Sequence, residues 1–139
     1  MTLDQVIEQL RTALPAMARG DPAPVKSLYS RADDATLANP FGPAVVGWTS
    51  VSSALDFASS RFSDGDVIGI ERIASYVASD LATFHDLEHW QTRVGGGELA
   101  QFDLRVTTTY RVEEGGWKIV HRHADPISSP NPDGPLRKS

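Results

Sequence analysis

The sequence LRVTTTYRVEEGGWKIVHRHAD, residues 104–125, decides the fold class. Apolar and polar residues alternate over residues 104–112 and again over residues 117–125, and two glycines lie between these runs. A period of two is typical of a β-strand, and glycine supplies the positive φ that a short hairpin turn needs. The pattern therefore predicts a β-hairpin.

The second run carries His121, His123 and Asp125 at every other position. Because successive side chains of a strand point to opposite faces, these three groups are expected to share one face. Trp117 and Ile119 precede them on the same face, which favours the inner one. An apolar surface that ends in two histidines and an aspartate predicts the wall of a pocket, with His123 and Asp125 near its rim.

The sequence before the hairpin predicts three helices followed by long strands. Thr2 and Gln5 have the spacing of a capping box at the start of the first helix. The helices are expected at residues 3–17, 25–29 and 51–62, a loop at 39–43, and strands at 35–38, 67–77, 81–94, 104–112 and 117–125. Helices first and an antiparallel meander afterwards indicate an α+β fold with the helices on one curved sheet face. Long antiparallel strands curl, and helices inside the concavity leave a conical cavity.

Composition limits the function classes. The 139 residues fit one domain, expected at residues 1–126, followed by a flexible proline-rich tail at 127–139. A net charge of −5 without a basic cluster argues against nucleic-acid binding. The chain has no cysteine and no run of apolar residues long enough for a membrane span, so a cytoplasmic protein that does not bind membranes is expected.

Three motifs occur in a recognisable order: DDATL at residues 33–37, NPFG at residues 39–42, and GWKIVHRHAD at residues 116–125. Together with the order of helices and strands, they resemble the nuclear transport factor 2 (NTF2-like) superfamily, and within it the SnoaL-like and ketosteroid-isomerase-like proteins. The resemblance spans roughly residues 3–126. It implies a cone-shaped α+β fold in which a strongly curved antiparallel sheet wraps around N-terminal helices.

The residues of the ketosteroid isomerase mechanism are replaced in this chain. The resemblance places the catalytic aspartate at Asn39, the oxyanion-hole tyrosine near Ala13 and the protonated aspartic acid near Thr108. An amide cannot act as a general base at ordinary pH. The steroid isomerase mechanism is therefore disfavoured.

The resemblance also places one face of strand 81–94 on the cavity wall, which includes Asp86 and Glu88. A histidine beside a carboxylate is an economical acid–base device, since the carboxylate fixes the tautomer and raises the pKa of the ring. We therefore predict His121 as the catalytic proton carrier, with Glu88 or Asp86 as its partner. The predicted substrate-binding residues are Asn39, Phe84, Trp90, Thr108, Tyr110, His123 and Asp125. Alternatively, the histidines hold the end of the strand and the carboxylates are solvated.

These expectations lead to several functional hypotheses. The first is a SnoaL-like protein whose cavity binds a small, mostly apolar organic molecule, with cofactor-independent isomerisation, cyclisation or hydration as its chemistry. The second is a non-catalytic ligand-binding or assembly module, and the third is a polyketide aldol cyclase. No cofactor is expected, and the His-x-His pattern is too short to predict a metal. The family resemblance implies a homodimer through the outer sheet face, which is expected to present Thr107, Thr109, Val120 and Ala124.

Overall fold

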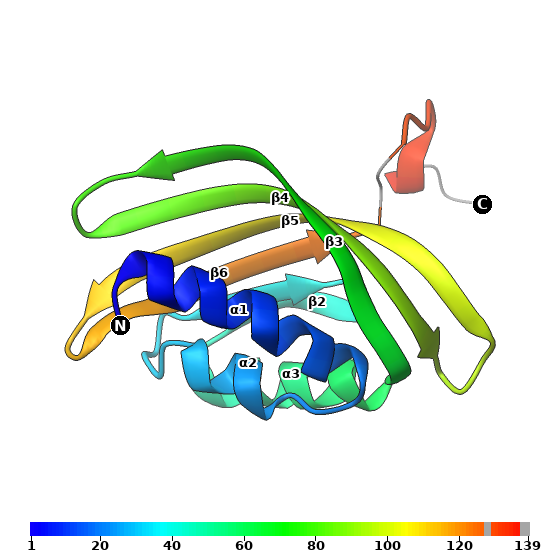
Figure 1. The fold of residues 1–139 in the computed structure, drawn as a ribbon, viewed down its shortest axis with the longest axis horizontal. Coiled ribbons are helices and arrows are strands. Elements are labelled where there is room, and N and C mark those ends of the chain that lie inside the picture. Colours follow the sequence, from blue (N-terminus) through cyan, green and yellow to red (C-terminus); the bar gives the residue numbers. More distant parts are fainter. Residues whose placement is uncertain (127–128, 137–139) are drawn as a thin grey trace.

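A computed structural model describes residues 1–126 and 129–136 of the chain. Three helices lie on the concave face of one curved six-stranded sheet (Figure 1). The elements are α1 (Leu3–Ala18), α2 (Ala23–Leu28), β1 (Thr36–Asn39), β2 (Gly42–Val46), α3 (Trp48–Ser60), β3 (Phe62–Val77), β4 (Leu81–Val94), β5 (Leu99–Glu113), β6 (Gly116–Asp125) and the 3-10 turn η1 (Gly134–Leu136). The predicted α+β architecture is confirmed. Residues 127–128 and 137–139 of the predicted tail lie outside the described residues.

Helix α1 begins with the predicted capping box. The Thr2 hydroxyl accepts a hydrogen bond from the Gln5 N–H (3.2 Å), and the Gln5 side chain accepts one from the Thr2 N–H (2.9 Å). Two N–H groups that would otherwise lack partners at the helix start are thereby satisfied. The apolar face of α1 is buried against the sheet through Val6, Leu10, Ala13, Leu14 and Met17. None of the described helices is long and apolar enough to cross a membrane.

The strands are arranged in the order β2-β1-β6-β5-β4-β3. Strands β3 to β6 form the predicted antiparallel meander, and β1 joins the sheet by pairing in parallel with β6. Strand β2 was not predicted, because Pro43 and the neighbouring glycine indicated a loop. It lies at the sheet edge, where a proline without an N–H interrupts no second ladder.

Irregular pairing curves the sheet. The pairing of β3 with β4 shifts register at three places, and the pairing of β5 with β6 shifts once. Bulges of this kind bend a strand and increase its twist. Strand β3 accordingly bends along its length and wraps around α1 (Figure 1).

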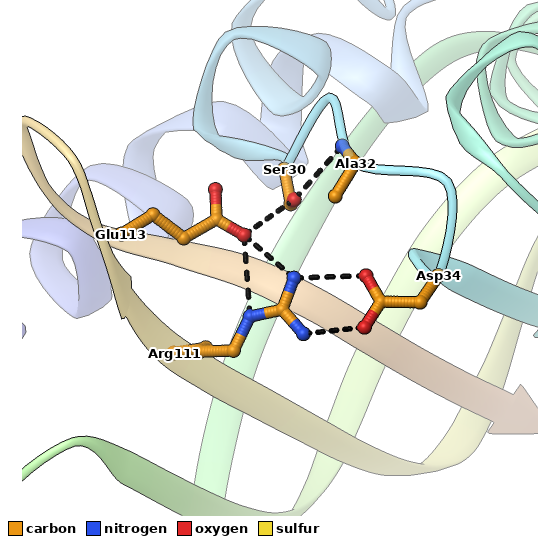
Figure 2. A network of polar contacts seen from close by, with 5 residues as sticks. All are labelled: Ser30, Ala32, Asp34, Arg111 and Glu113. Carbon is orange, nitrogen blue, oxygen red and sulfur yellow. Dashed lines mark hydrogen bonds and ion pairs between the residues drawn. The ribbon is translucent and has the colours of Figure 1, made fainter.

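An ion-pair network fixes the segment before β1 to the β5–β6 hairpin. The Arg111 guanidinium donates to both Asp34 oxygens (2.7 and 2.9 Å) and to Oε2 of Glu113 (2.7 Å). Ser30 donates to the same Glu113 oxygen (2.7 Å) and accepts a hydrogen bond from the Ala32 N–H (3.1 Å). Figure 2 shows Arg111 between the two carboxylates. The network holds the approach to β1 in place and so supports the pairing of β1 with β6.

Candidate functional site

A buried ion pair lies on the concave face of the sheet. Arg122 on β6 donates to both oxygens of Glu88 on β4, with Nη1–Oε2 and Nη2–Oε1 distances of 2.9 and 2.6 Å. Glu88 is 1% and Arg122 is 6% exposed. Because β5 lies between β4 and β6, the Arg122 side chain must cross β5 to reach Glu88. The Trp90 Nε1–H donates to Oε1 of Glu88 at 3.0 Å, which adds a third donor to the carboxylate.

The charge of Arg122 is maintained by its partner. Burial alone would lower the pKa of Arg122, but the attraction and hydrogen bonds of the Glu88 carboxylate outweigh this effect. The pKa of Arg122 is therefore raised above its ordinary value, and the side chain is a permanent cation inside an apolar layer.

A β-bulge at Val120 decides which side chains of β6 point inward. Tyr110 pairs with Ile119, whereas the neighbouring Thr109 pairs with His121, so Val120 is the extra residue. An extra residue reverses the alternation of faces beyond it. The prediction from the sequence assumed regular alternation throughout this strand.

Beyond the bulge, the inward positions are Arg122 and Ala124. The predicted placement of His121, His123 and Asp125 on the inner face is therefore wrong, and so is the predicted outward position of Ala124. The pairing of His121 with Glu88 or Asp86 is not formed.

His121 and its neighbours lie on the convex face instead. His121 Nδ1 is 2.8 Å from the hydroxyl of Thr36 on β1. His123 is exposed, and the Asp125 carboxylate accepts two hydrogen bonds from Arg105 (2.8 and 3.0 Å). These contacts agree with the alternative prediction, in which the histidines hold the end of the strand.

The other two histidines, His85 and His89 on β4, also lie on the convex face, because they alternate with the buried Phe84, Glu88 and Trp90. His85 lines a shallow groove with His123. His89 lies between two carboxylates, 2.6 Å from Asp103 and 2.7 Å from Glu71. All four histidines of the chain thus lie on the convex face, away from Arg122.

We expect His89 and His121 to titrate on opposite sides of pH 6.5. Hydrogen bonds to Asp103 and Glu71 raise the pKa of His89, whereas burial and the neighbouring His123 lower the pKa of His121. The His89 pairing therefore stabilises the fold below pH 6.5, and this stabilisation disappears as the pH rises through the raised pKa. The His121 environment has the opposite effect, since the fold loses stability as the pH falls below 6.5.

Ring-proton NMR titration measures both pKa values. The control Asp103→Asn should lower the pKa of His89 and leave that of His121 unchanged. A pKa of His121 above 6.5 would instead indicate a carboxylate partner and contradict this placement.

A small apolar chamber lies beside Arg122 on the concave face. Its volume is about 50 Å³. The lining includes Leu14, Met17, Leu37, Asn39, Phe41, Leu55, Ala58, Phe62, Trp90, Leu104, Arg122 and Ala124. Among the described residues that line it, Arg122 is the one charged side chain.

Asn39 brings a second polar group to the chamber. It ends β1, and its Oδ1 accepts a hydrogen bond from the Phe41 N–H at 3.0 Å. The side-chain NH2 is then the group that Asn39 can offer to a ligand, and it is a donor. Both polar groups of the chamber are therefore donors, which favours a ligand with an acceptor.

Asp86 lines a separate recess of about 10 Å³ between α1, β3 and β4, together with Glu88 and Tyr110. Its carboxylate pairs with Arg72, with an Nε–Oδ1 distance of 2.5 Å. Burial raises the pKa of Tyr110, so its hydroxyl stays protonated. Glu88 and Asp86 are thus both neutralised by arginines.

The inner faces of β4 and β5 follow the prediction. Phe84, Glu88, Trp90, Thr108 and Tyr110 are all buried on the concave side. Of the predicted substrate-binding residues, Asn39 and Trp90 line the chamber, Tyr110 lines the smaller recess, and Phe84 and Thr108 belong to the surrounding core. Their roles in binding remain predictions.

Arg122 is the site residue that sequence reasoning missed. A signal for it was present, because a glutamate on a buried strand face requires a cation. Within residues 1–126 and 129–136, no three His, Asp or Glu side chains are grouped so that they could hold a metal ion.

Comparison with known proteins identifies the family. Residues 6–129 match the model of the SnoaL-like domain. The chain belongs to the SnoaL-like family. The predicted resemblance is confirmed, although no curated protein matches this SnoaL-like domain in sequence.

Solved structures place this SnoaL-like domain in the NTF2-like fold. An NTF2-like superfamily protein from Salmonella enterica is 18% identical with a TM-score of 0.74, covering 94% of this chain and 92% of its own. A candidate calcium/calmodulin-dependent protein kinase II association domain from Thiobacillus denitrificans is 16% identical with a TM-score of 0.73, covering 91% and 96%. A candidate ketosteroid isomerase from Parabacteroides distasonis is 17% identical with a TM-score of 0.57, covering 88% and 83%. At these identities the likeness concerns the fold, which carries several unrelated functions.

Proposed function

We propose that this SnoaL-like domain binds a small, mostly apolar organic molecule in the chamber, with a hydrogen-bond acceptor of the ligand directed at Arg122. The observation that carries the proposal is a buried guanidinium in the wall of an otherwise apolar chamber. Ligand sites typically combine an apolar lining with a few placed polar groups. The NH2 group of Asn39 supplies a second donor for the same acceptor or a neighbouring one.

The ligand that we propose is neutral at its polar end. Glu88 already neutralises Arg122 through two hydrogen bonds. An anionic ligand would bring an uncompensated negative charge into apolar surroundings, which is costly. A ketone, ester or amide oxygen can accept a remaining N–H of Arg122 without that cost.

Binding is better supported than catalysis by a histidine. A proton carrier must come within hydrogen-bond reach of the reacting group. His121 lies on the convex face and contacts Thr36, and the two carboxylates predicted as its partners are bound by arginines. The function that we propose is therefore ligand binding, without the histidine–carboxylate proton transfer predicted from the sequence.

Isothermal titration calorimetry tests this proposal with 2-acetylnaphthalene, a neutral ketone, and 2-naphthoate, its anionic counterpart. We expect the ketone to bind at least about tenfold more tightly than the carboxylate. A tenfold ratio of dissociation constants corresponds to a difference of only about 1.4 kcal/mol in binding free energy. Ala58→Val fills part of the chamber and should weaken ketone binding about tenfold. The control Ala16→Val makes the same change on α1 away from the chamber and should leave binding unchanged. Equal binding by wild type and Ala58→Val would refute the proposal.

We also propose that the convex face mediates a homodimer. Val46, Thr36, His121, Thr109, Thr83 and Tyr76 form one row across all six strands. Both ends of the row are apolar and exposed, with Val46 64% and Tyr76 67% accessible. In between, Thr83 and Thr109 hydrogen-bond to each other at 3.0 Å, so burial of the row would leave few polar groups unsatisfied.

Size-exclusion chromatography with light scattering should give twice the mass of one chain. Thr109→Lys places a charge in the middle of the row and should shift the mass to that of a monomer. Ser53→Lys adds the same charge to the exposed side of α3 and should not. A wild-type monomer at 100 µM would contradict the proposed dimer.

A further inference from the structure

The chamber beside Arg122 is too small for the ligand that we propose. Its volume is about 50 Å³. Sites for organic ligands are about 300–1,000 Å³, and a cavity that takes up benzene is about 150 Å³. Water fits into the chamber in this conformation, whereas a ring does not. Binding therefore requires that a side chain of the lining move.

An apolar groove lies on the other side of the same wall. It has a volume of about 130 Å³, runs between the β1–β2 hairpin and α3, and includes the ring of Phe57. Groove and chamber share Leu37, Asn39 and Phe41. Leu37 is part of the buried core, and Asn39 is short and hydrogen-bonded to the backbone of the turn. Phe41 is thus the large, half-buried side chain that separates the two spaces.

Phe41 is the second member of a row of four aromatic rings. Its ring centroid is 6.1 Å from that of Phe57 and 5.5 Å from that of Phe62, in both cases edge to face. Phe62 in turn lies 5.3 Å from Trp90 in the chamber wall. The row leads from a 56% exposed ring at Phe57 to a 3% exposed ring at Trp90. An incoming ring could replace Phe41 and make the same edge-to-face contacts.

The backbone at Phe41 is held, but the space beside it is open. The hydrogen bond from the Phe41 N–H to Asn39 fixes the turn. The groove of about 130 Å³ lies directly against the side chain of Phe41. The ring of Phe41 therefore has space to turn into the groove while the turn keeps its backbone hydrogen bond.

We propose that Phe41 is the gate of the ligand site and determines the size of the molecule that can enter. The inference rests on the proposed function of the chamber. With the ring of Phe41 turned out, groove and chamber form one site with Arg122 at the inner end and Phe57 at the outer end. This site takes an elongated molecule with a flat apolar ring system and a neutral acceptor at its leading end.

Stopped-flow binding of 2-acetylnaphthalene, followed by quenching of tryptophan fluorescence from Trp90, tests the gate. Phe41→Ala should raise the association rate constant at least about tenfold, because the closed state no longer limits access. Phe41→Trp should lower it by a similar factor. Ile68→Ala truncates an exposed apolar side chain on β3, outside both spaces and outside the proposed dimer row, and should leave the rate within about twofold of wild type. Thermal unfolding monitored by circular dichroism verifies that each variant is folded.

The outcomes separate the gate from the binding site. Unchanged rates in both Phe41 variants, with binding still weakened about tenfold by Ala58→Val, would overturn the gate and leave the proposed function intact. Binding that is insensitive to Ala58→Val would overturn both. Binding by Phe41→Ala alone, with none by wild type, would support the gate and show that it is closed in the free protein.

Discussion

Glu88→Ala is expected to lower the free energy of unfolding by about 3–5 kcal/mol, the largest effect of any single substitution considered for this SnoaL-like domain. The substitution leaves Arg122 buried without the carboxylate that holds both of its Nη atoms. It also removes the acceptor of the Trp90 N–H. A buried charge without a partner costs more than the pair contributes when it is intact. Urea unfolding at pH 7, analysed by linear extrapolation, measures the change.

A double replacement is the sharpest control for this prediction. Glu88→Leu combined with Arg122→Met exchanges the ion pair for apolar side chains and should recover most of the loss, because desolvation of both charges is avoided. The exposed pair of Lys26 and Asp56, 2.8 Å apart, supplies a surface comparison. Asp56→Ala should cost about 0–1 kcal/mol. If Glu88→Ala cost no more than Asp56→Ala, the ion pair would not be desolvated as the structure indicates.

The inner face of the sheet could be predicted where strands alternate regularly. The pairing of β4 with β5 has no register shift, and Glu88, Trp90 and Tyr110 accordingly face inward as the sequence indicated. Regular alternation is a local property of the chain, so a period of two is sufficient to assign the faces.

The orientation of β6 could not be predicted in this way, because its bulge depends on distant residues. At Ile119 the strand forms an isolated parallel bridge with Tyr29, and the Ile119 carbonyl accepts a hydrogen bond from the Ser30 N–H at 2.7 Å. From His121 onward its neighbour is β1, beginning at Thr36. The change of partner falls at the extra residue of the bulge, and nothing in the local sequence of β6 marks it. The one-residue shift turns the side chains of His121 and His123 to the convex face and that of Arg122 to the concave face.

The sequence predicted the region of the chamber correctly, but the charged side chain in its wall is Arg122 and not a histidine. Long strands and N-terminal helices indicated a cavity, and Asn39 and Trp90 do line one. Its size is set by side chains such as Phe41, whose position depends on the β1–β2 hairpin. Because β2 was expected to be a loop, the wall between chamber and groove could not be foreseen.

Gly65→Ala is expected to destabilise the domain by about 2–3 kcal/mol through overpacking. A Cβ at Gly65 would lie 2.5 Å from the carbonyl oxygen of Ala18 and 2.5 Å from both Cβ and Oγ1 of Thr92. Thr92 is fully buried, and its hydroxyl lies 3.0 Å from the carbonyl oxygen of Ala18 and 2.9 Å from that of Ser63, either of which can accept its one proton. The added methyl therefore meets backbone and a hydrogen-bonded β-branched side chain, neither of which can rotate away. Urea unfolding should show a lower midpoint with an unchanged slope.

Gly42→Ala is the matched control, because it makes the same substitution where there is room. An alanine Cβ at Gly42 would meet no atom within 4 Å, and the backbone there has no positive φ. We expect a change within about 0.5 kcal/mol, as for exposed positions in general. Equal effects of the two substitutions would mean that the loss of glycine flexibility in the unfolded chain outweighs packing. A large effect at Gly65 alone would show that β3 closely approaches both the end of α1 and β4 at this residue. This close approach holds α1 against the sheet. It thereby maintains the part of the chamber wall that Leu14 and Met17 form.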